Sequence, residues 1–474
     1  MSYDERDNDA LRLKENIRIY EDAKRKGVPA IMSASELCDI AEHYYNNGRG
    51  NDAVEVLRFA MEVYPGTAAP LVLMARIALL EQHDSDLAMH YIDLVEDTSD
   101  LDYMYILAEI TILQESAEEA DRYLRHCLDN VVDEDDEPDF VLDVAALFMD
   151  YGYADLAQEW LDRSDEDDLD DYKELVGRIA MSRGEYKKSA EIFEKILEDD
   201  PYSADVWNNL ASAQFMQNKV EEAIESSEYS IAINPNDDKA LVNKGHGLQQ
   251  LGKHEEALEY YRRFTALYPN DESGYMLQGG ALTALSRYEE ALDMYKTAEK
   301  KARGNATARY EAYVEIAFTL SALGRTDEAI AYVDKARRLK VSDRAELLLL
   351  RAHIYLSNDD IEKAKKNYRK AISESDDEMK TLLRVSVSVL DCGYFKMAYK
   401  FLSVYIHSMK DEITDGYSYM ALCCKHLNEH EMFLKYLKLA ADINPGEART
   451  VLGELFPRGV QPQDYYEYAK HNDI

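Results

Sequence analysis

The stretch 239–269 reads KALVNKGHGLQQLGKHEEALEYYRRFTALYP, and its pattern recurs along the chain. Ala257 lies in the sequence EEAL at its centre, and 34 residues to either side Ala223 and Ala291 lie in EEAI and EEAL. The closing proline recurs at the same interval, at Pro201, Pro235 and Pro269. Self-similarity at one fixed period of this length is typical of repeat proteins, in which each repeat is one supersecondary unit.

Within one repeat the apolar residues follow a helical period. They are spaced three or four residues apart, which places them on one face of a helix: Ala257, Tyr260 or Tyr261, Phe264 and Leu267. The pairs Asn236-Asp237 and Asn270-Asp271 follow the prolines, where they can cap the next helix. Because one helix pair cannot bury its apolar face alone, neighbouring pairs are expected to stack into a continuous core.

On these residues the chain resembles the tetratricopeptide repeat family. The family pattern has a large early residue, a small one four positions on, a later Ala, an aromatic and a closing Pro, here Leu241, Gly245, Gly252, Ala257, Tyr261, Phe264 and Pro269. The resemblance implies an all-α, right-handed superhelical solenoid of antiparallel helix pairs. Extending the register over about residues 34–447 gives twelve units, whose second-helix small positions are Ala53, Ala88, Ala120, Ala157, Ser189, Ala223, Ala257, Ala291, Ala329, Ala364, Ala398 and, degenerately, Phe433.

The match to the repeat pattern divides the chain into sections. These are an N-terminal amphipathic capping helix (1–33), divergent units one to four with acidic loops (34–168), well-matched units five to eight (169–303), units nine to twelve (304–447), and a C-terminal cap and tail (448–474). The first helix has an apolar stripe of Ala10, Leu13, Ile17 and Tyr20 that can cover the first repeat, form a dimer or bind a partner. Three tyrosines of the tail are expected to dock on the solenoid, namely Tyr465, Tyr466 and Tyr468.

Composition restricts the possible partners and compartment. The net charge of −39 repels phosphate backbones, so binding to nucleic acid or to an anionic membrane surface is not expected. Five cysteines without a CxxC motif fit a reducing cytoplasm better than a disulfide framework. The sequence shows neither a signal peptide nor an apolar run of about 20 residues, so we expect a cytoplasmic protein without membrane insertion.

Charge is distributed unevenly along the chain. Residues 131–173 hold seventeen acidic residues, with dense runs at Asp133–Glu137 and Asp165–Asp168 where turns between repeats are expected. Such runs favour exposed loops, and a docking patch for a basic partner is the alternative. Residues 335–370 have the opposite bias, which can reflect a solvated face or a surface that orients a partner.

No catalytic constellation is evident. Residues 247–253 resemble a phosphate loop, but His254 stands where Ser or Thr would bind magnesium, and no strand is expected before it. Cys423, Cys424, His426 and His430 form a cluster in sequence only, because just the two histidines share a helix face. We therefore expect neither an enzyme nor a bound metal or cofactor.

In the family, the first helices of the pairs line a concave groove that binds peptides. By register, units six and seven present polar groove residues at Asn208, Asn209, Ser212, Lys239, Asn243 and His246. The next four units present an apolar stripe of Met276, Val314, Phe318, Leu349, His353, Leu356, Leu383, Val387 and Leu390. This stripe predicts a groove for an amphipathic helix or hydrophobic peptide, unless curvature or the C-terminal tail buries it.

The expected function is that of a protein-binding scaffold or adaptor, and the alternative is a chaperone-like holder of hydrophobic client segments. Recognition of a chaperone's C-terminal carboxylate is disfavoured. Lys380 and Arg384 match the last two positions of the family's five-residue clamp, but Val314, Phe318 and Leu350 stand at the earlier ones. No oligomeric state follows from the sequence.

Overall fold

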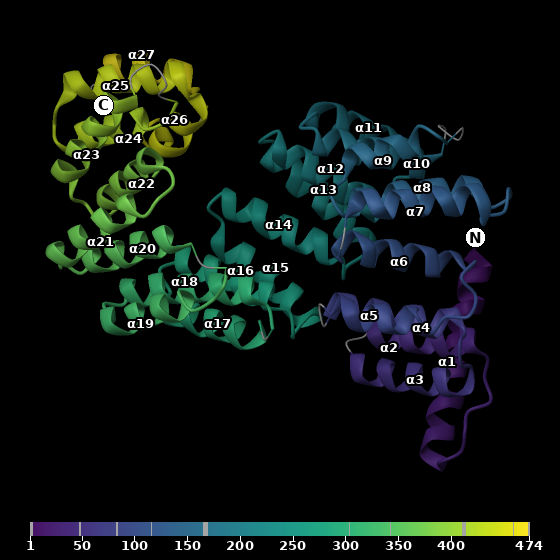
Figure 1. The fold of residues 1–474 in the computed structure, drawn as a ribbon. Helices are drawn as coiled ribbons and strands as arrows, with labels where there is room; N and C mark the ends of the chain where they lie inside the picture. Colours follow the sequence, from purple (N-terminus) through teal and green to yellow (C-terminus); the bar gives the residue numbers. More distant parts are fainter. Residues whose placement is uncertain are drawn as a thin grey trace. The chain divides into compact units, whose positions relative to one another are not determined.

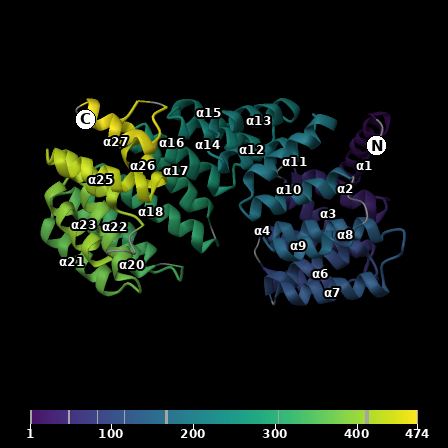
Figure 2. The ribbon, with the colours of Figure 1, turned by 90° about the horizontal axis from the view of Figure 1, so that it is seen from above.

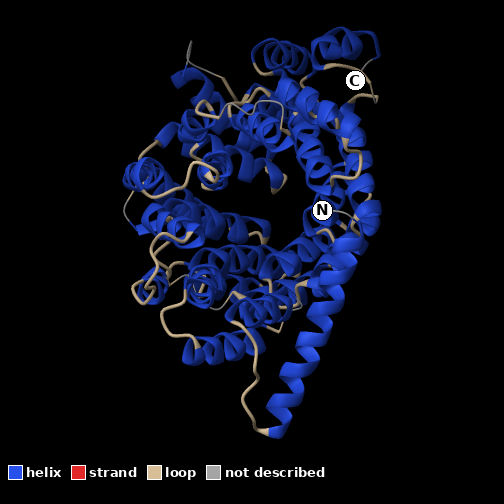
Figure 3. Cartoon of the chain, turned by 90° about the vertical axis from the view of Figure 1, so that its right-hand side faces the viewer, coloured by secondary structure: helices blue, strands red, loops and turns tan. Residues whose placement is uncertain are grey.

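The computed structural model describes residues 3–46, 49–81, 84–114, 116–164, 169–302, 304–341, 343–409, 414–457 and 459–472. Within these ranges all regular secondary structure is helical, and no strand occurs (Figure 1, Figure 3). The all-α prediction is therefore confirmed. None of the described helices combines the length and apolar character needed to cross a membrane.

The helices follow one another as twelve pairs, each joined by a short turn. After α1 (Tyr3–Lys26), the first six pairs are α2 (Ala34–Asn46) and α3 (Gly50–Val63), α4 (Ala68–Glu81) and α5 (Ser85–Ile92), α6 (Leu101–Gln114) and α7 (Ala117–Asn130), α8 (Glu137–Asp150) and α9 (Ala154–Leu161), α10 (Asp170–Ser182) and α11 (Tyr186–Asp199), α12 (Ala204–Met216) and α13 (Val220–Ile233). The next six are α14 (Asp238–Gln250) and α15 (His254–Leu267), α16 (Glu272–Ala284) and α17 (Tyr288–Lys301), α18 (Ala306–Ala322) and α19 (Thr326–Ala336), α20 (Arg344–Ser357) and α21 (Ile361–Ser373), α22 (Glu378–Asp391) and α23 (Phe395–Met409), α24 (Tyr417–His426) and α25 (His430–Ile443). The chain continues through α26 (Pro445–Leu452), η2 (Gly453–Leu455), η3 (Pro462–Asp464) and α27 (Tyr465–Asn472).

The chain consists of two compact units, Met1–Lys253 and His254–Ile474, and the division falls between α14 and α15. In the first unit each first helix contacts the first helix of the following pair, from α2 through α4, α6, α8, α10 and α12 to α14. In the second unit the same contacts run from α16 through α18, α20 and α22 to α24. Each unit is thus a stack of helix pairs in chain order, as expected for this solenoid class.

Small side chains allow the two helices of a pair to cross closely. Ala53 and Ala291, for example, are fully buried in the column identified from the sequence, and the degenerate Phe433 is buried as well. Gly279 of α16 lies so close to α17 that an added Cβ would be 2.4 Å from Cε1 of Tyr295. In the first unit, a Cβ on Gly177 would lie 2.6 Å from Cε1 of Phe193.

The expected N-caps are present, and the aspartates provide them. Asp237 accepts a hydrogen bond from the backbone N–H of Ala240 and caps α14. Asp271 accepts one from the backbone N–H of Ser273 and caps α16. A short polar side chain after the closing proline therefore starts the next helix, as the Asn-Asp pairs indicated.

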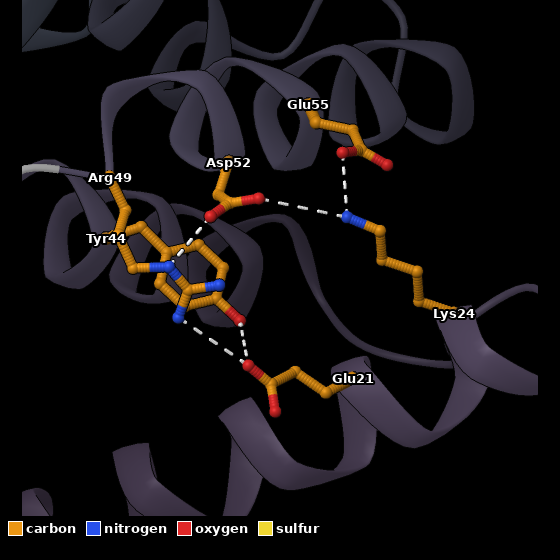
Figure 4. A network of polar contacts seen from close by, with 6 residues as sticks. All are labelled: Glu21, Lys24, Tyr44, Arg49, Asp52 and Glu55. Atoms are coloured by element: carbon orange, nitrogen blue, oxygen red, sulfur yellow. Dashed lines mark hydrogen bonds and ion pairs between the residues drawn. The ribbon is translucent and has the colours of Figure 1, made fainter.

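Helix α1 packs against the first repeat. Leu13, Ile17 and Tyr20 contact the cluster that contains Leu37 and Leu57, whereas the side chain of Ala10 lies outside the described part. Figure 4 shows a polar network beside this contact, in which Lys24 reaches Glu55 at 2.7 Å, Tyr44 donates to Glu21, and Arg49 binds Asp52. The helix therefore covers the first repeat through both apolar and ionic contacts.

The C-terminal segment docks on the last repeat. Tyr465 is buried and stacks on Phe456 at 3.9 Å between ring centroids, and the ring of Tyr468 meets Phe456 edge-on. Helix α27 contacts α25, and Figure 2 shows it near α25 and α26. The ammonium group of Lys438 lies over the ring of Tyr466. The predicted docking of the three tyrosines is confirmed, and it takes place at the end of the solenoid.

The charged segments also take defined places. Asp133–Glu137 forms the exposed turn between α7 and α8 and the start of α8, whereas Asp165–Asp168 lies outside the described residues. In the basic segment, most cations on α20 and α21 have carboxylate partners, such as Arg344 with Glu374 at 2.7 Å. Others are Arg351 with Asp334, Lys363 with Asp360, Lys365 with Glu362 and Lys370 with Glu374. These ion pairs within the protein favour the interpretation of the basic segment as a solvated face.

Candidate functional site

A groove of about 610 Å³ opens on the first helices of the second unit. Its walls come from α18, α20 and α22, and Asp415 before α24, Tyr419 in α24 and Glu447 in α26 complete the lining. The apolar lining residues are Val314, Phe318, Leu347, Leu349, Leu350, Leu383 and Val387. The polar lining residues are Tyr310, Glu346, His353, Arg384, Ser388, Asp391, Asp415, Tyr419 and Glu447.

Six of the residues projected from the sequence meet in this groove. They are Val314 and Phe318 on α18, Leu349 and His353 on α20, and Leu383 and Val387 on α22. Each pair is four residues apart, so both side chains lie on one face of their helix. Stacking three consecutive first helices then brings the three pairs together, which is why the repeat register could predict them.

Other members of the projected apolar stripe take different places. Leu356 and Leu390 are buried in the core of the second unit and are not among the residues that line the groove, so their assignment to an open groove was wrong. Met276 lies half-buried on α16, outside the residues that line this groove. Among the described residues, none after Glu447 lines the groove, so the described part of the C-terminal tail does not fill it.

The groove has a buried floor and an open rim. Leu349 is 7% exposed at the floor, whereas Phe318 is 40% exposed, which is unusual for a large aromatic side chain. The Phe318 ring meets the imidazole of His353 edge-to-face, with 5.5 Å between ring centroids. An exposed aromatic ring above an apolar floor is the arrangement expected of a surface that contacts another molecule.

His353 keeps the middle of the groove uncharged. Its Nδ1 lies 3.0 Å from Oγ of Ser388, which also lies 2.7 Å from the hydroxyl of Tyr368. Burial lowers the pKa of His353 below its ordinary value, although the Ser388 hydrogen bond opposes this. The imidazole is therefore neutral at pH 7 and adds to the apolar character of the groove.

Charged groups lie around the apolar lining. The guanidinium of Arg384 binds Glu346 at 2.8 Å, so this residue of the clamp pattern is already neutralised. Asp415 accepts a hydrogen bond from the amide of Asn444, and the Glu447 carboxylate accepts from the backbone N–H groups of Gly416 and Ser418. Desolvation raises the pKa of Asp391 above its ordinary value.

These rim residues were missed by the sequence reasoning. Asp391 lies four residues after the groove position Val387, so extending the projection on α22 by one helical turn would have included it. Glu447 belongs to α26, which lies beyond the last repeat, and no repeat register predicts its contribution. Tyr310, at the start of α18, also lines the groove, and its hydroxyl lies 3.4 Å from Glu346.

The polar residues projected for the first unit form a different pattern. Asn208 is 3% exposed and donates a hydrogen bond at 2.8 Å to Asp237, so it is wrong as a ligand-contacting residue. The reason is that Asp237, which caps the start of α14, lies next to Asn208 of α12 and takes up its side-chain amide. Asn209 lies half-buried and donates to Glu174 at 3.0 Å, and Ser212 bonds to its own helix backbone. The remaining three lie on α14, with Lys239 and His246 exposed and Asn243 half-buried.

The sequence features that suggested other chemistry have structural roles. Cys423 and Cys424 are buried in the core, and the ring of His426 stacks on Phe395 at 4.1 Å between centroids. Among the described residues, no group of three or more His, Cys, Asp or Glu side chains is placed to hold a metal ion. Gly247, in the segment that resembles a phosphate loop, is a packing glycine within α14, where a Cβ would lie 2.5 Å from Ile224.

The five thiols are expected to be almost inert in the folded protein. Burial raises the pKa of Cys38 and Cys423 to about 12 and that of Cys392 and Cys424 to about 11, and it also raises the pKa of Cys127. Because the thiolate is the reactive form, labelling at pH 8 should be at least about tenfold slower than for a free cysteine. Absorbance with a chromogenic disulfide reagent should report five thiols only after denaturant is added. Fast labelling of any thiol in the native protein would contradict this expectation.

The comparisons with known proteins agree with this architecture. Three tetratricopeptide repeat models match the chain, one over residues 242–306, one over 180–226, and one over 310–340 and 345–378. No curated protein matches the chain significantly.

Several solved structures are similar to the chain at low identity. Yeast Tom70 is 15% identical with a TM-score of 0.44, and the alignment covers 93% of this chain and 96% of Tom70. A tetratricopeptide repeat protein from Parabacteroides merdae is 16% identical with a TM-score of 0.41, over 52% of this chain and 97% of its own. The APC/C hetero-tetramer Cut9-Hcn1 is 16% identical with a TM-score of 0.35, over 95% of each chain.

The matched stretches contain the columns from which the repeat register was extended, and the helix pairs continue that register on both sides. Two of the three groove helices, α18 and α20, begin just before matched stretches, and their groove residues lie within those stretches. The chain is therefore a tetratricopeptide repeat protein with about twelve repeats.

Proposed function

We propose that this protein is a cytoplasmic, non-enzymatic adaptor that holds an apolar segment of a partner protein in the groove of α18, α20 and α22. The observation that carries the proposal is the alignment of apolar side chains from three consecutive repeats in one open groove. Repeat solenoids in general provide extended concave binding surfaces, because each repeat adds one row of side chains to the same face.

The groove has the physical properties of a helix or peptide site. It offers Val314, Leu383 and Val387 as half-buried contacts and Phe318 as an exposed one, so a ligand can remove apolar surface from water. First helices that pack side by side are about 8–10 Å apart, so the three of them span about the length of a short helix of a partner. The polar rim, with the Glu346–Arg384 pair, can add orientation to these contacts.

A second candidate function is that of a holder for unfolded client segments. The floor of the groove consists of leucine and valine side chains, which lack directional hydrogen bonds and accept many apolar sequences. The two functions differ in selectivity, because an adaptor has one stoichiometric partner, whereas a holder suppresses the aggregation of many proteins.

The double variant Phe318→Glu with Val387→Glu tests the site. Two carboxylates in the groove replace apolar contacts and must be desolvated by a ligand, so affinity should fall at least about tenfold. Helicity and the melting temperature should stay nearly unchanged, because neither side chain is fully buried. Cross-linking mass spectrometry on protein captured from its native cells, followed by affinity measurement on the captured partner, provides the readout.

The matched control is Val404→Glu with Ile443→Glu, which adds the same charge at exposed positions of α23 and α25 outside the groove. Control and wild type should bind alike. A dominant partner that still binds the groove variant would exclude this site, and loss of helicity would show that the two residues belong to the core. A broad set of clients that depends on Phe318 and Val387 would favour the holder.

A further inference from the structure

We propose that the groove selects segments that carry a Lys or Arg side chain beside their apolar residues, and that Asp391 receives this cation. The inference rests on the proposed function, because it concerns the chemistry of the ligand in the same groove. It concerns a residue outside the six groove positions that the repeat register identified.

The charge of the lining is strongly unbalanced. Four carboxylates line the groove, at Glu346, Asp391, Asp415 and Glu447, against the single guanidinium of Arg384. Since His353 is kept neutral, the lining has a net charge of about three negative units. A ligand with an acidic side chain or a free C-terminal carboxylate is repelled here, whereas a cationic one is attracted.

Three of these carboxylates already have partners. Glu346 binds Arg384 at 2.8 Å, and Asp415 accepts from Asn444 at 2.8 Å. Glu447 holds the start of α24 through the backbone N–H of Gly416, also at 2.8 Å. These contacts fix the geometry of the groove and leave fewer oxygen lone pairs for a ligand.

Asp391 differs from the other three. Within the described part of the chain its carboxylate makes neither an ion pair nor a hydrogen bond, and it is the last residue of α22. The C-terminal end of a helix carries a partial negative charge, so a carboxylate there is unfavourably placed. Asp391 is exposed at the edge of the groove, and partial desolvation by its neighbours still raises the pKa of its carboxyl and adds to this cost. A cation from a ligand would relieve both penalties, and it would do so at the edge of the apolar lining.

The geometry matches a long amphipathic side chain. Val387 lies one helical turn before Asp391 on α22, so the two side chains share one face. A lysine or arginine can place its methylene chain along the valine and its charged end at the carboxylate. A partly desolvated ion pair of this kind gives selectivity as well as attraction.

The test uses the full chain and three synthetic amphipathic peptides of about 18 residues, each long enough to form a helix of about 27 Å. All three have the same leucine face, flanked by lysines in the first, glutamines in the second and glutamates in the third. Fluorescence anisotropy should give the tightest binding for the lysine peptide, by roughly tenfold over the glutamine peptide, and the weakest for the glutamate peptide. Asp391→Asn should remove most of the lysine preference, measured as the ratio of the affinities for the lysine and glutamine peptides.

The matched control is Asp293→Asn on α17, which removes the same charge at an exposed site outside the groove. General attraction between a cationic peptide and an acidic protein is the same in both variants, so only a local role of Asp391 separates them. An equal lysine preference in the two variants would overturn this inference while the groove function stands. Binding of none of the peptides, or equal binding by the Phe318→Glu, Val387→Glu variant, would instead overturn the groove function.

Discussion

Trp160→Ala should lower the free energy of unfolding of the first unit by about 4 kcal/mol, the range found for removing a fully buried tryptophan. Trp160 on α9 is inaccessible to solvent, and its ring meets Phe140 of α8 edge-on at 6.2 Å. Its indole N–H donates a hydrogen bond to Asp121 of α7 at 2.8 Å. The variant therefore creates a cavity and also removes a donor from a buried carboxylate, which raises the cost further.

The ionic surroundings of Trp160 make the effect local. Arg125 pairs with Asp121 at 2.7 Å, and the guanidinium groups of Arg125 and Arg163 lie 5.6 Å and 5.0 Å from the indole ring. Since repeats contact only their neighbours, the destabilisation should spread over α6 to α10 and decay along the stack. Hydrogen exchange should accelerate there and stay unchanged in α20 to α25.

The other tryptophan is the matched control. Trp207 is only partly buried, stacks on Tyr229 at 4.6 Å and donates to the backbone carbonyl of Pro201. Trp207→Ala should cost about 1–2 kcal/mol, because less apolar area leaves the protein interior. Urea denaturation followed by circular dichroism measures both variants. Equal costs for the two substitutions would contradict the assigned burial.

The fold could be predicted because its physics repeats. A helix pair that cannot bury its own apolar face must stack, and the 34-residue interval between Ala223, Ala257 and Ala291 reports that stacking directly. Units two and four gave a weaker pattern because their second helices are short. Helices α5 and α9 each have eight residues, so fewer columns of the repeat are present.

The groove could be predicted in part. Positions four residues apart on each first helix were enough to identify Phe318 and Val387, because neighbouring repeats present the same face. The same register failed at Asn208, since a side chain at that position of α12 meets the helix cap formed by Asp237. Whether a polar residue faces a ligand or a neighbouring cap depends on contacts between repeats, which a single-repeat pattern does not contain. The repeat register could not predict Glu447 either, because this residue belongs to a helix outside the repeats.

Two adjacent glycines of α16 should respond to alanine with opposite signs. In a helix interior Gly→Ala ordinarily stabilises by about 1 kcal/mol, because the unfolded chain loses conformational freedom. Gly280→Ala should show this stabilisation, because the added Cβ would meet no neighbouring atom within 4 Å. At Gly279 the Cβ would lie 2.4 Å from Cε1 and 2.7 Å from Cδ1 of Tyr295, whose ring is 2% exposed and has little room to move.

Overpacking of a buried ring costs about 1–3 kcal/mol, and at 2.4 Å the upper part of this range applies. We therefore expect Gly279→Ala to destabilise the second unit by about 1–2 kcal/mol net, after the gain in helix propensity is included. Gly280→Ala should stabilise it by about 0.5–1 kcal/mol. Both variants add one methyl group to the same helix, so propensity alone predicts equal shifts of the denaturation midpoint. A stabilising effect at Gly279 would mean that α16 and α17 are not held together as closely as the Tyr295 contact requires, and the small-residue column would lose its physical explanation.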